Sequence, residues 1–191
     1  MIQLLDDQAC ACCPALAASR SRIVHGYGNP GARIVFIGEA PGRHGADRTG
    51  VPFSGDKSGR VLQRMLIELG LSAEQAPAER PRLHCFVTNA VRCCPPANRT
   101  PTPREQANCA PFLAAELAAI DPRIVVPIGL TALQAVARHY QFAIPSTIRP
   151  LHATPIEQAR RVIVPLIHPS RISRAQIEAF MMTMRRVMGD G

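Results

Sequence analysis

The sequence lacks long apolar runs. No stretch approaches the roughly 18 apolar residues that a membrane-crossing helix needs. The first residues, MIQLLDDQACACC, have neither a basic start nor an apolar stretch that ends in a cleavage site, so we expect no signal peptide. These absences predict a cytoplasmic, intracellular protein with no membrane partner.

Internal repeats and low-complexity linkers are also absent. The chain has 191 residues, of which 47% are hydrophobic, and this is enough to bury one substantial core. We therefore predict a single domain over residues 1–191 and a monomer.

The common phosphate-binding motifs are missing. The segment GEAPGRHGADRTGVPFSGD, residues 38–56, is rich in glycine but has neither the GKS or GKT of a Walker loop nor a dinucleotide-binding GxGxxG. Clustered carboxylate and histidine ligands for two metal ions are missing too. A nucleotide or phosphate-ester hydrolase that uses residues 38–42 is therefore only a rival hypothesis, and it would require a divalent metal.

The chain does have an excess of basic residues and several cysteines. A formal net charge of +8 suggests a polyanionic partner such as nucleic acid, although a basic surface can also be functionally neutral. In a reducing compartment, the 7 cysteines favour buried thiols, catalytic thiolates or metal ligands over a disulfide framework.

Short β-branched runs alternate with helical patterns. The runs predict buried strands over 33–38, 84–91, 123–129 and 161–168. Pro127 and Pro165 weaken the last two strands, because proline cannot donate to a ladder. The alternation predicts an α/β fold with three α/β/α layers and a mostly parallel, four-stranded central sheet.

Local signals mark where the helices begin and end. Asp56 is a candidate N-cap for a helix with apolar residues at helical spacing that ends before Gly70. Thr102, Pro103 and Glu105 open a second helix that runs to about Ile120. Helices are also predicted over 130–139 and 173–188.

Polar residues follow the predicted strands, where parallel sheets bind ligands. The glycine-rich loop follows the first strand, Asn89 lies at the end of the second, and HPSR, residues 168–171, ends the fourth. Each residue has a structural alternative, since Asp56 could only cap a helix, Asn89 could only close a turn, and a lone histidine is usually structural. Their joint placement predicts a functional crevice.

Three segments in order resemble those of a known family. GEAPG with PFSGDKSG, NAVRCCPPANRTPTPREQANC and HPS are similar to the signature segments of iron-sulfur uracil-DNA glycosylases of families 4 and 5. The resemblance runs from Cys10 to about Arg171. Glu39 is similar to family 4, whereas HGADRTG followed by FSGD resembles family 5, which we favour.

The resemblance implies a DNA repair enzyme of base excision repair, associated with the nucleoid. It would flip uracil out of DNA, hydrolyse its N-glycosidic bond and leave an abasic site; other deaminated bases are further candidate substrates. A non-catalytic iron-sulfur module that binds nucleic acid or senses redox state is the alternative. That alternative predicts DNA binding without uracil cleavage.

The resemblance also implies a 4Fe-4S cluster. Cys10 and Cys13 have the close CxxC spacing that such a cluster uses, and the family pairs them with Cys93 and Cys109. Zinc is the rival metal, because four thiolates suit it equally. Prolines after Cys93 would stiffen the loop that presents the ligands.

The other cysteines leave alternatives open. Cys12 and Cys94 could each replace a neighbouring ligand, whereas Cys85 is expected in the core. Cys109 lies in helical register with apolar residues, so it could be a small core residue instead of a ligand.

The resemblance assigns catalytic roles to three polar side chains. His168 would donate a hydrogen bond to the departing uracil oxygen. Glu39 would orient the attacking water and favour positive charge on the sugar, with Asp56 as the second choice. Asp47 is a third carboxylate in the same loop.

The resemblance also implies contacts with base and DNA. Asn89 would read the edge of uracil and Phe53 would stack on it, although Phe53 could simply pack in the core. Gly38 and Ala40 would complete the base pocket. Arg99, Ser170 and Arg171 would contact DNA, with Arg171 near the space that the flipped base leaves.

Overall fold

The computed structural model describes residues 10–189, which fold around a six-stranded sheet with strand order β1-β3-β2-β4-β6-β5. The four central strands are mutually parallel: β3 (Phe86–Asn89), β2 (Ile34–Gly38), β4 (Ile124–Pro127) and β6 (Arg161–Ile163). They correspond to the four predicted strands. The edge strands β1 (Tyr27–Gly28) and β5 (Ile156–Gln158) pair antiparallel with their neighbours and were not among the four predicted strands. Strands this short show no periodicity in the sequence.

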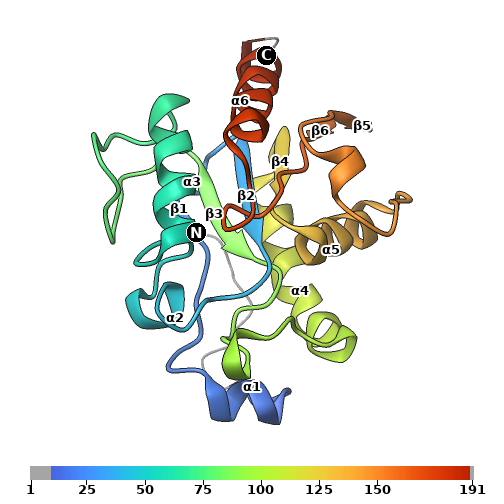
Figure 1. The fold of residues 1–191 in the computed structure, drawn as a ribbon. Coiled ribbons are helices and arrows are strands. Elements are labelled where there is room, and N and C mark those ends of the chain that lie inside the picture. Colours follow the sequence, from blue (N-terminus) through green and yellow to red (C-terminus); the bar gives the residue numbers. More distant parts are fainter. Residues whose placement is uncertain (1–9, 190–191) are drawn as a thin grey trace.

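Helices cover both faces of the sheet (Figure 1). Helices α3 (Lys57–Glu68) and α6 (Arg174–Gly189) lie on one face, and α4 (Pro103–Ile120) and α5 (Leu130–Tyr140) lie on the other. This arrangement confirms the predicted three-layer α/β/α fold.

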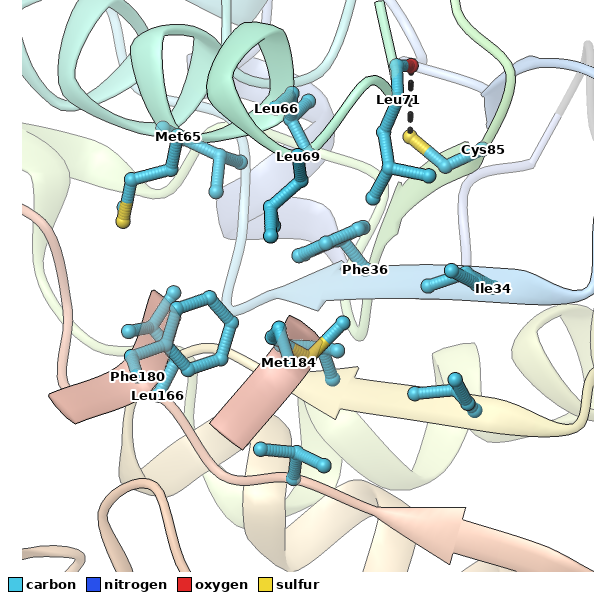
Figure 2. Packing of buried hydrophobic residues seen from close by; sticks show 14 of the residues in the cluster. Ile34, Phe36, Met65, Leu66, Leu69, Leu71, Cys85, Leu166, Phe180 and Met184 are labelled. Atoms are coloured by element: carbon cyan, nitrogen blue, oxygen red, sulfur yellow. Dashed lines mark hydrogen bonds between the residues drawn. The ribbon is translucent and has the colours of Figure 1, made fainter. Parts of the chain in front are cut away.

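The side chains of β2 show how the two cores form. Because successive strand residues point to opposite faces, Phe36 packs toward α3 and α6, whereas Val35 and Ile37 pack toward α4 and α5. Figure 2 shows Phe36 between Leu69, the C-cap residue of α3, and Met184 of α6. The first core therefore fixes the position of β2, whose end leads into the predicted glycine-rich loop.

The predicted helix starts are confirmed. The Asp56 side chain accepts a hydrogen bond of 2.7 Å from the backbone N–H of Gly59 at the start of α3. At the start of α4, Thr102 and Glu105 form a reciprocal capping box. Gly70 follows α3 with a φ of +69°, a left-handed conformation that favours glycine.

The last two parallel strands are shorter than predicted. Strand β4 ends at Pro127 and β6 ends at Ile163, before Pro165. Backbone pairing continues past them, because Ile128 N–H donates to Ile37 at 2.8 Å and Leu166 N–H donates to Pro127 at 2.9 Å. The prolines thus interrupt the ladder while the chain stays aligned toward the carboxyl end of the sheet.

The other elements are short turns of helix in the connections: α1 (Pro14–Ser19), α2 (Ala46–Thr49), η1 (Pro96–Asn98) and η2 (Arg149–Leu151). Within residues 10–189, none of the helices combines the length and the apolar character needed to span a bilayer. The expected absence of a signal peptide concerns mainly residues 1–9, which lie outside the described part of the chain.

The strand order defines where a ligand should bind. Strand β2 has β3 on one side and β4 on the other, so the connections that leave β2 and β4 diverge. In open α/β sheets, the crevice at such a switch point is the usual ligand site.

Candidate active site

A cavity of about 810 Å³ opens at the carboxyl ends of the strands. This volume is in the range of small-molecule sites. The loops that follow β2, β3 and β6 contribute to its wall, as the sequence predicted, and the segment that follows β4 contributes as well. Most of the predicted site residues line it: Glu39, Ala40, Phe53, Asp56, Asn89, Arg99, His168, Ser170 and Arg171.

Gly38 lies under the point where two pocket side chains meet. A Cβ atom at Gly38 would lie 2.4 Å from Asn89 Oδ1 and 2.6 Å from Phe53 Cζ. Such contacts are too short for real atoms, so only glycine lets the amide and the ring approach each other here. Gly38 thus allows close packing beneath the cavity, and its contact with a base stays a prediction.

The backbone of Phe53 is held in a left-handed conformation, with a φ of 54°. The buried side chain of Gln63 fixes it by donating to the Phe53 carbonyl at 2.9 Å. The ring lines the cavity and also packs against the core beneath. The packing of Phe53 against the core is confirmed, and its stacking on a base stays a prediction.

Asn89 presents an unpaired donor. Its side chain is only 5% exposed and lines the cavity, and its Nδ2 has no hydrogen-bond partner among the described residues. Buried amide groups are nearly always paired, so an unpaired one needs an explanation. A ligand carbonyl oxygen in the cavity would satisfy this N–H group.

His168 is held in one orientation by Ser170. The Ser170 backbone N–H donates to His168 Nδ1 at 3.3 Å, and the Ser170 hydroxyl lies 2.8 Å from the same atom. Because Nδ1 accepts, the neutral ring carries its proton on Nε2. Burial lowers the pKa of His168, opposed by the nearby carboxylates Glu39 and Asp56. The arrangement favours a neutral Nε2–H donor.

Glu39 is oriented by a threonine that the sequence analysis missed. Thr131 Oγ1, in the first turn of α5, donates to Glu39 Oε2 at 2.5 Å. Thr131 is itself buried, so its hydroxyl has little freedom to move elsewhere. The carboxylate also lies near the N-terminus of α5, where the helix dipole favours negative charge. Thr131 follows β4 closely in the sequence, and a polar residue after a parallel strand is the signal that could have identified it.

Asp56 has a structural contact and a free oxygen. Its Oδ1 caps α3, as predicted. Its Oδ2 packs against Gly42 and Gly45, where a Cβ at Gly45 would lie at 2.5 Å. Asp56 therefore both caps a helix and contributes a carboxylate oxygen to the cavity wall.

Asp47 does not line the cavity. Its side chain is fully buried and accepts hydrogen bonds from Ser21 and Arg43. The third carboxylate of the loop therefore faces away from the cavity.

The basic residues at the rim differ in their contacts. Arg99 forms two hydrogen bonds to Glu105, of 2.7 and 2.8 Å, and these bonds lower the pKa of Glu105 to about 2. Arg171 is exposed, and its backbone N–H donates to the His168 carbonyl at 2.9 Å; within residues 10–189 its side chain forms no hydrogen bond or ion pair. The Arg171 side chain is thus the freer of the two to meet a phosphate, and the DNA contact of Arg99 stays a prediction.

The predicted metal ligands gather beside α1 and the start of α4. Cys13, Cys93 and Cys109 pack in one small cluster, and the charges of Cys10 and Cys13 both act on the pKa of Cys93 and Cys109. Burial raises the pKa of Cys109 to about 11, so this thiol would ionise only with a strong partner such as a metal.

Nitrogen donors point at two of these sulfur atoms. Arg20 Nη1 lies 3.2 Å from Cys93 Sγ, and Asn108 Nδ2 lies 3.3 Å from Cys13 Sγ. Hydrogen bonds of this kind support thiolates that bind metal. Among the described residues, no group of three or more cysteine, histidine or carboxylate side chains is arranged around a single ion.

The remaining cysteines lie elsewhere. Cys94 Sγ lies 3.6 Å from the Pro95 carbonyl and 3.7 Å from Asn98 Oδ1, and Cys12 is exposed. Cys85 is buried in the sheet core, as predicted, and burial raises its pKa to about 12 (Figure 2).

The fold and the cavity define an α/β protein with a polar ligand pocket at the switch point of a parallel sheet. A family model described as the uracil DNA glycosylase superfamily matches residues 25–187. The chain therefore belongs to this superfamily.

Curated relatives of two types match most of the chain. The type-4 uracil-DNA glycosylase of Thermotoga maritima is 37% identical over 86% of this chain and 78% of its own length. The type-5 enzyme of Thermus thermophilus is 41% identical over 69% of each chain, and that of Pyrobaculum aerophilum is 33% identical over 95% of this chain and 88% of its own. The predicted resemblance to both types is confirmed.

Proposed function

We propose that this protein is a uracil-DNA glycosylase that hydrolyses the bond between uracil and deoxyribose in DNA. The observation that carries the proposal is the unpaired Nδ2 of Asn89, which lies in the cavity beside Phe53. A flat base that stacks on Phe53 and offers a carbonyl oxygen to Asn89 matches both features. Uracil has such an oxygen at position 4, where cytosine has an amino group.

In the chemical step, the bond between C1′ and N1 breaks and the electron pair goes to the base. The sugar becomes oxocarbenium-like, and the leaving uracil becomes an anion. His168 Nε2–H would donate a hydrogen bond to that anion, since Ser170 holds the other ring nitrogen as an acceptor. A water molecule then attacks C1′.

The attacking water loses a proton to a carboxylate. Glu39 suits this role because Thr131 occupies Oε2 and leaves Oε1 for the water. The negative charge of Glu39 would also stabilise the positive sugar. Asp56 remains the second choice, since its Oδ2 lies at the cavity wall.

We further propose that Cys10, Cys13, Cys93 and Cys109 hold a 4Fe-4S cluster. Four thiolates suit such a cluster, and the N–H groups of Arg20 and Asn108 would support the sulfur charges. When bound, the cluster would cross-link the segment before α1, the loop after β3 and helix α4. Its role is structural, and no step of the reaction passes through it.

The remaining proposals concern partners and location. The net charge of +8 supports binding to the phosphate backbone, and exposed Arg171 lies where a side chain could fill the space left by a flipped base. We propose an intracellular, nucleoid-associated monomer with the single domain of residues 1–191.

One assay tests the function directly. A labelled oligonucleotide with one uracil is incubated with the protein without magnesium, and abasic sites are then cleaved with alkali. We expect cleavage at uracil and none at thymine in the same position. Intact uracil strands, with DNA binding retained, would overturn the proposal and favour the non-catalytic module. Absorbance at about 400 nm is expected if the cluster is bound, and colourless protein with stoichiometric zinc would contradict the proposed cluster.

A further inference from the structure

Asp47 is a buried carboxylate that the proposed reaction does not use. It lies in α2, within the loop of residues 38–56 that carries Glu39, Phe53 and Asp56, and it is 0% exposed. An ionised side chain is buried this completely only where donors match its oxygens. The residues that donate to Asp47 therefore show which segments its side chain connects.

The donors connect α2 to a distant segment. Ser21 donates its backbone N–H to Asp47 Oδ1 at 2.9 Å and its hydroxyl to Oδ2 at 2.8 Å. Arg43 Nη1 donates to Asp47 Oδ2 at 2.8 Å, and Arg43 Nη2 donates to Ser19 Oγ at 2.7 Å. Asp47 and Arg43 thus tie the catalytic loop to residues 19–21.

The residue between the two serines contacts the cysteine centre, which comprises Cys10, Cys13, Cys93 and Cys109. Arg20 lies between the two serines, and its Nη1 donates to Cys93 Sγ at 3.2 Å while its Nη2 donates to the Cys10 carbonyl at 2.8 Å. Consecutive residues therefore serve two sites, since Ser19 and Ser21 hold the catalytic loop and Arg20 holds the cysteines.

Helix α2 supports catalytic side chains in turn. Gly45 precedes the helix and packs against Asp56 Oδ2 so closely that a Cβ atom would lie 2.5 Å away. Thr49 Oγ1, in the last turn, lies 2.6 Å from the hydroxyl of Ser54, next to Phe53. A shift of α2 would therefore move both Asp56 and Phe53.

We propose that Asp47 is a positioning residue through which the cysteine centre holds the catalytic loop in its active arrangement. Loss of order at the cysteines would release Arg20 and the serines beside it, and α2 would loosen. The importance for catalysis rests on the proposed excision of uracil, and the test by metal removal rests on the proposed cluster, whereas the Arg20 variant tests the coupling without either. Because such coupling is reciprocal, a change at Asp47 should also loosen the cysteine centre.

Hydrogen exchange of the α2 amides tests the coupling. Arg48 N–H, Thr49 N–H and Gly50 N–H are bonded within this turn, so their exchange reports its opening. Exchange is measured in the protein as isolated and after removal of its metal by oxidation and chelation. In the wild type, we expect metal removal to speed exchange on the order of 10-fold, while the amides of α5 keep their protection.

Asp47→Ala should give fast α2 exchange before metal removal and little further change after it. Asp121→Ala is the matched control, because Asp121 is an exposed carboxylate paired with Arg160 and Arg161. It should respond to metal removal as the wild type does. Unchanged α2 exchange in the metal-depleted wild type, or an Asp47→Ala response equal to that of the wild type, would overturn the proposal.

Arg20→Met provides a second route if Asp47→Ala fails to fold. It removes the donors to the cysteines while keeping the volume of the side chain, and it should speed α2 exchange although both serines remain. Slow exchange in Arg20→Met would contradict the coupling.

Activity separates this proposal from the proposed function. In Asp47→Ala, the rate of uracil excision at saturating DNA should fall while DNA affinity stays, and Asp47→Asn should restore part of the rate because its Oδ1 can still accept from Ser21. If no variant excises uracil but the exchange results hold, only the proposed function fails. If excision is normal in Asp47→Ala and exchange does not respond, only the coupling fails.

Discussion

Carboxylates in two regions of this molecule are used in different ways. Around the cavity, Glu39 and Asp56 each accept a hydrogen bond on one oxygen and form no ion pair within residues 10–189. Away from it, Asp47, Glu105 and Glu116 accept donors on both oxygens, and each pairs with an arginine. The paired carboxylates hold segments together, whereas Glu39 and Asp56 each keep one oxygen that, under the proposed function, could accept from a substrate or a water.

Neutral groups follow the same division. Asn89 in the cavity keeps an unpaired Nδ2, while Gln63 nearby donates to Phe53 and Ala78 and accepts from Ala78. A free buried hydrogen-bonding group costs stability, so its presence marks where binding energy is to be gained. The contrast predicts that substitutions in the cavity lower the rate of excision. Substitutions of fully hydrogen-bonded side chains should instead lower the stability of the fold.

The largest effect on rate is expected at His168. His168→Ala removes the donor to the leaving base and should slow single-turnover excision by roughly 100-fold or more. Affinity for uracil-containing DNA should stay, because phosphate contacts supply most of it. Ser170→Ala is the control and should lose less, since its backbone N–H still orients the ring. Equal losses in rate and affinity would show that His168 mainly binds DNA.

Glu39 and Asp56 should differ in their effect. At saturating enzyme, where binding differences disappear, Glu39→Gln should slow excision by roughly 100-fold, and Asp56→Asn should slow it less. The reason is that Asp56 Oδ1 caps α3 and its Oδ2 packs against Gly42 and Gly45, whereas Thr131 orients Glu39 through Oε2 alone. A rate for Glu39→Gln near that of the wild type, with a large loss in Asp56→Asn, would remove Glu39 from the mechanism and give a family 5 mode of action.

Asn89→Asp tests recognition. The substitution replaces the unpaired N–H donor with an acceptor that faces the uracil carbonyl oxygen, so uracil excision should fall by at least about 10-fold. Weak excision of cytosine should appear, because its amino group can donate to the new carboxylate. Excision measured side by side on uracil and cytosine oligonucleotides gives the ratio. An unchanged ratio would mean that Asn89 does not read this edge of the base.

Thr131→Val should have a smaller effect. Valine keeps the shape of the buried side chain but loses the hydroxyl that orients Glu39, so the single-turnover rate should fall by about 10-fold. Thr131→Ser is the matched control and should restore most of the rate. Equally slow excision by the serine and valine variants would contradict the prediction, because altered packing would then explain the loss of rate.

Glu116→Gln should have the smallest effect on rate. Glu116 is buried and paired with Arg92 at 2.8 Å, away from the cavity. Removing one charge of a buried pair should lower the free energy of unfolding by about 3 kcal/mol, while the excision rate of the folded protein stays the same. Denaturant unfolding and single-turnover assays measure the two quantities. A variant with a slower excision rate but an unchanged free energy of unfolding would contradict the distinction between the two kinds of carboxylate.

Features set by local signals could be predicted from the sequence. The caps at Asp56 and Thr102 depend on residues within one turn of each other, and β-branched runs mark the strands that stay buried. Because parallel strands end at one edge, the approximate meeting of Glu39, Asn89 and His168 followed from their place after strands.

Side-chain direction could not be predicted in the same way. The hydrogen bonds of the Arg99 guanidinium to Glu105 were not predicted, and neither was the direction of Asp47, which points away from the cavity that its loop borders. Thr131 reaches Glu39 from another element, 92 residues away along the chain. Such contacts depend on how elements pack, and the spacing of residues in one segment carries no information about them.

The edges of the sheet have a consequence for self-association. One edge is β1, which has two residues and is followed by Asn29 and Pro30, and the other is β5, which has three residues and follows Pro155. A strand edge can recruit another chain only through a row of unpaired backbone groups, and short edges beside prolines offer few of them. Such edges disfavour edge-to-edge pairing with another chain, and we predict that the sedimentation coefficient of the protein does not change with its concentration.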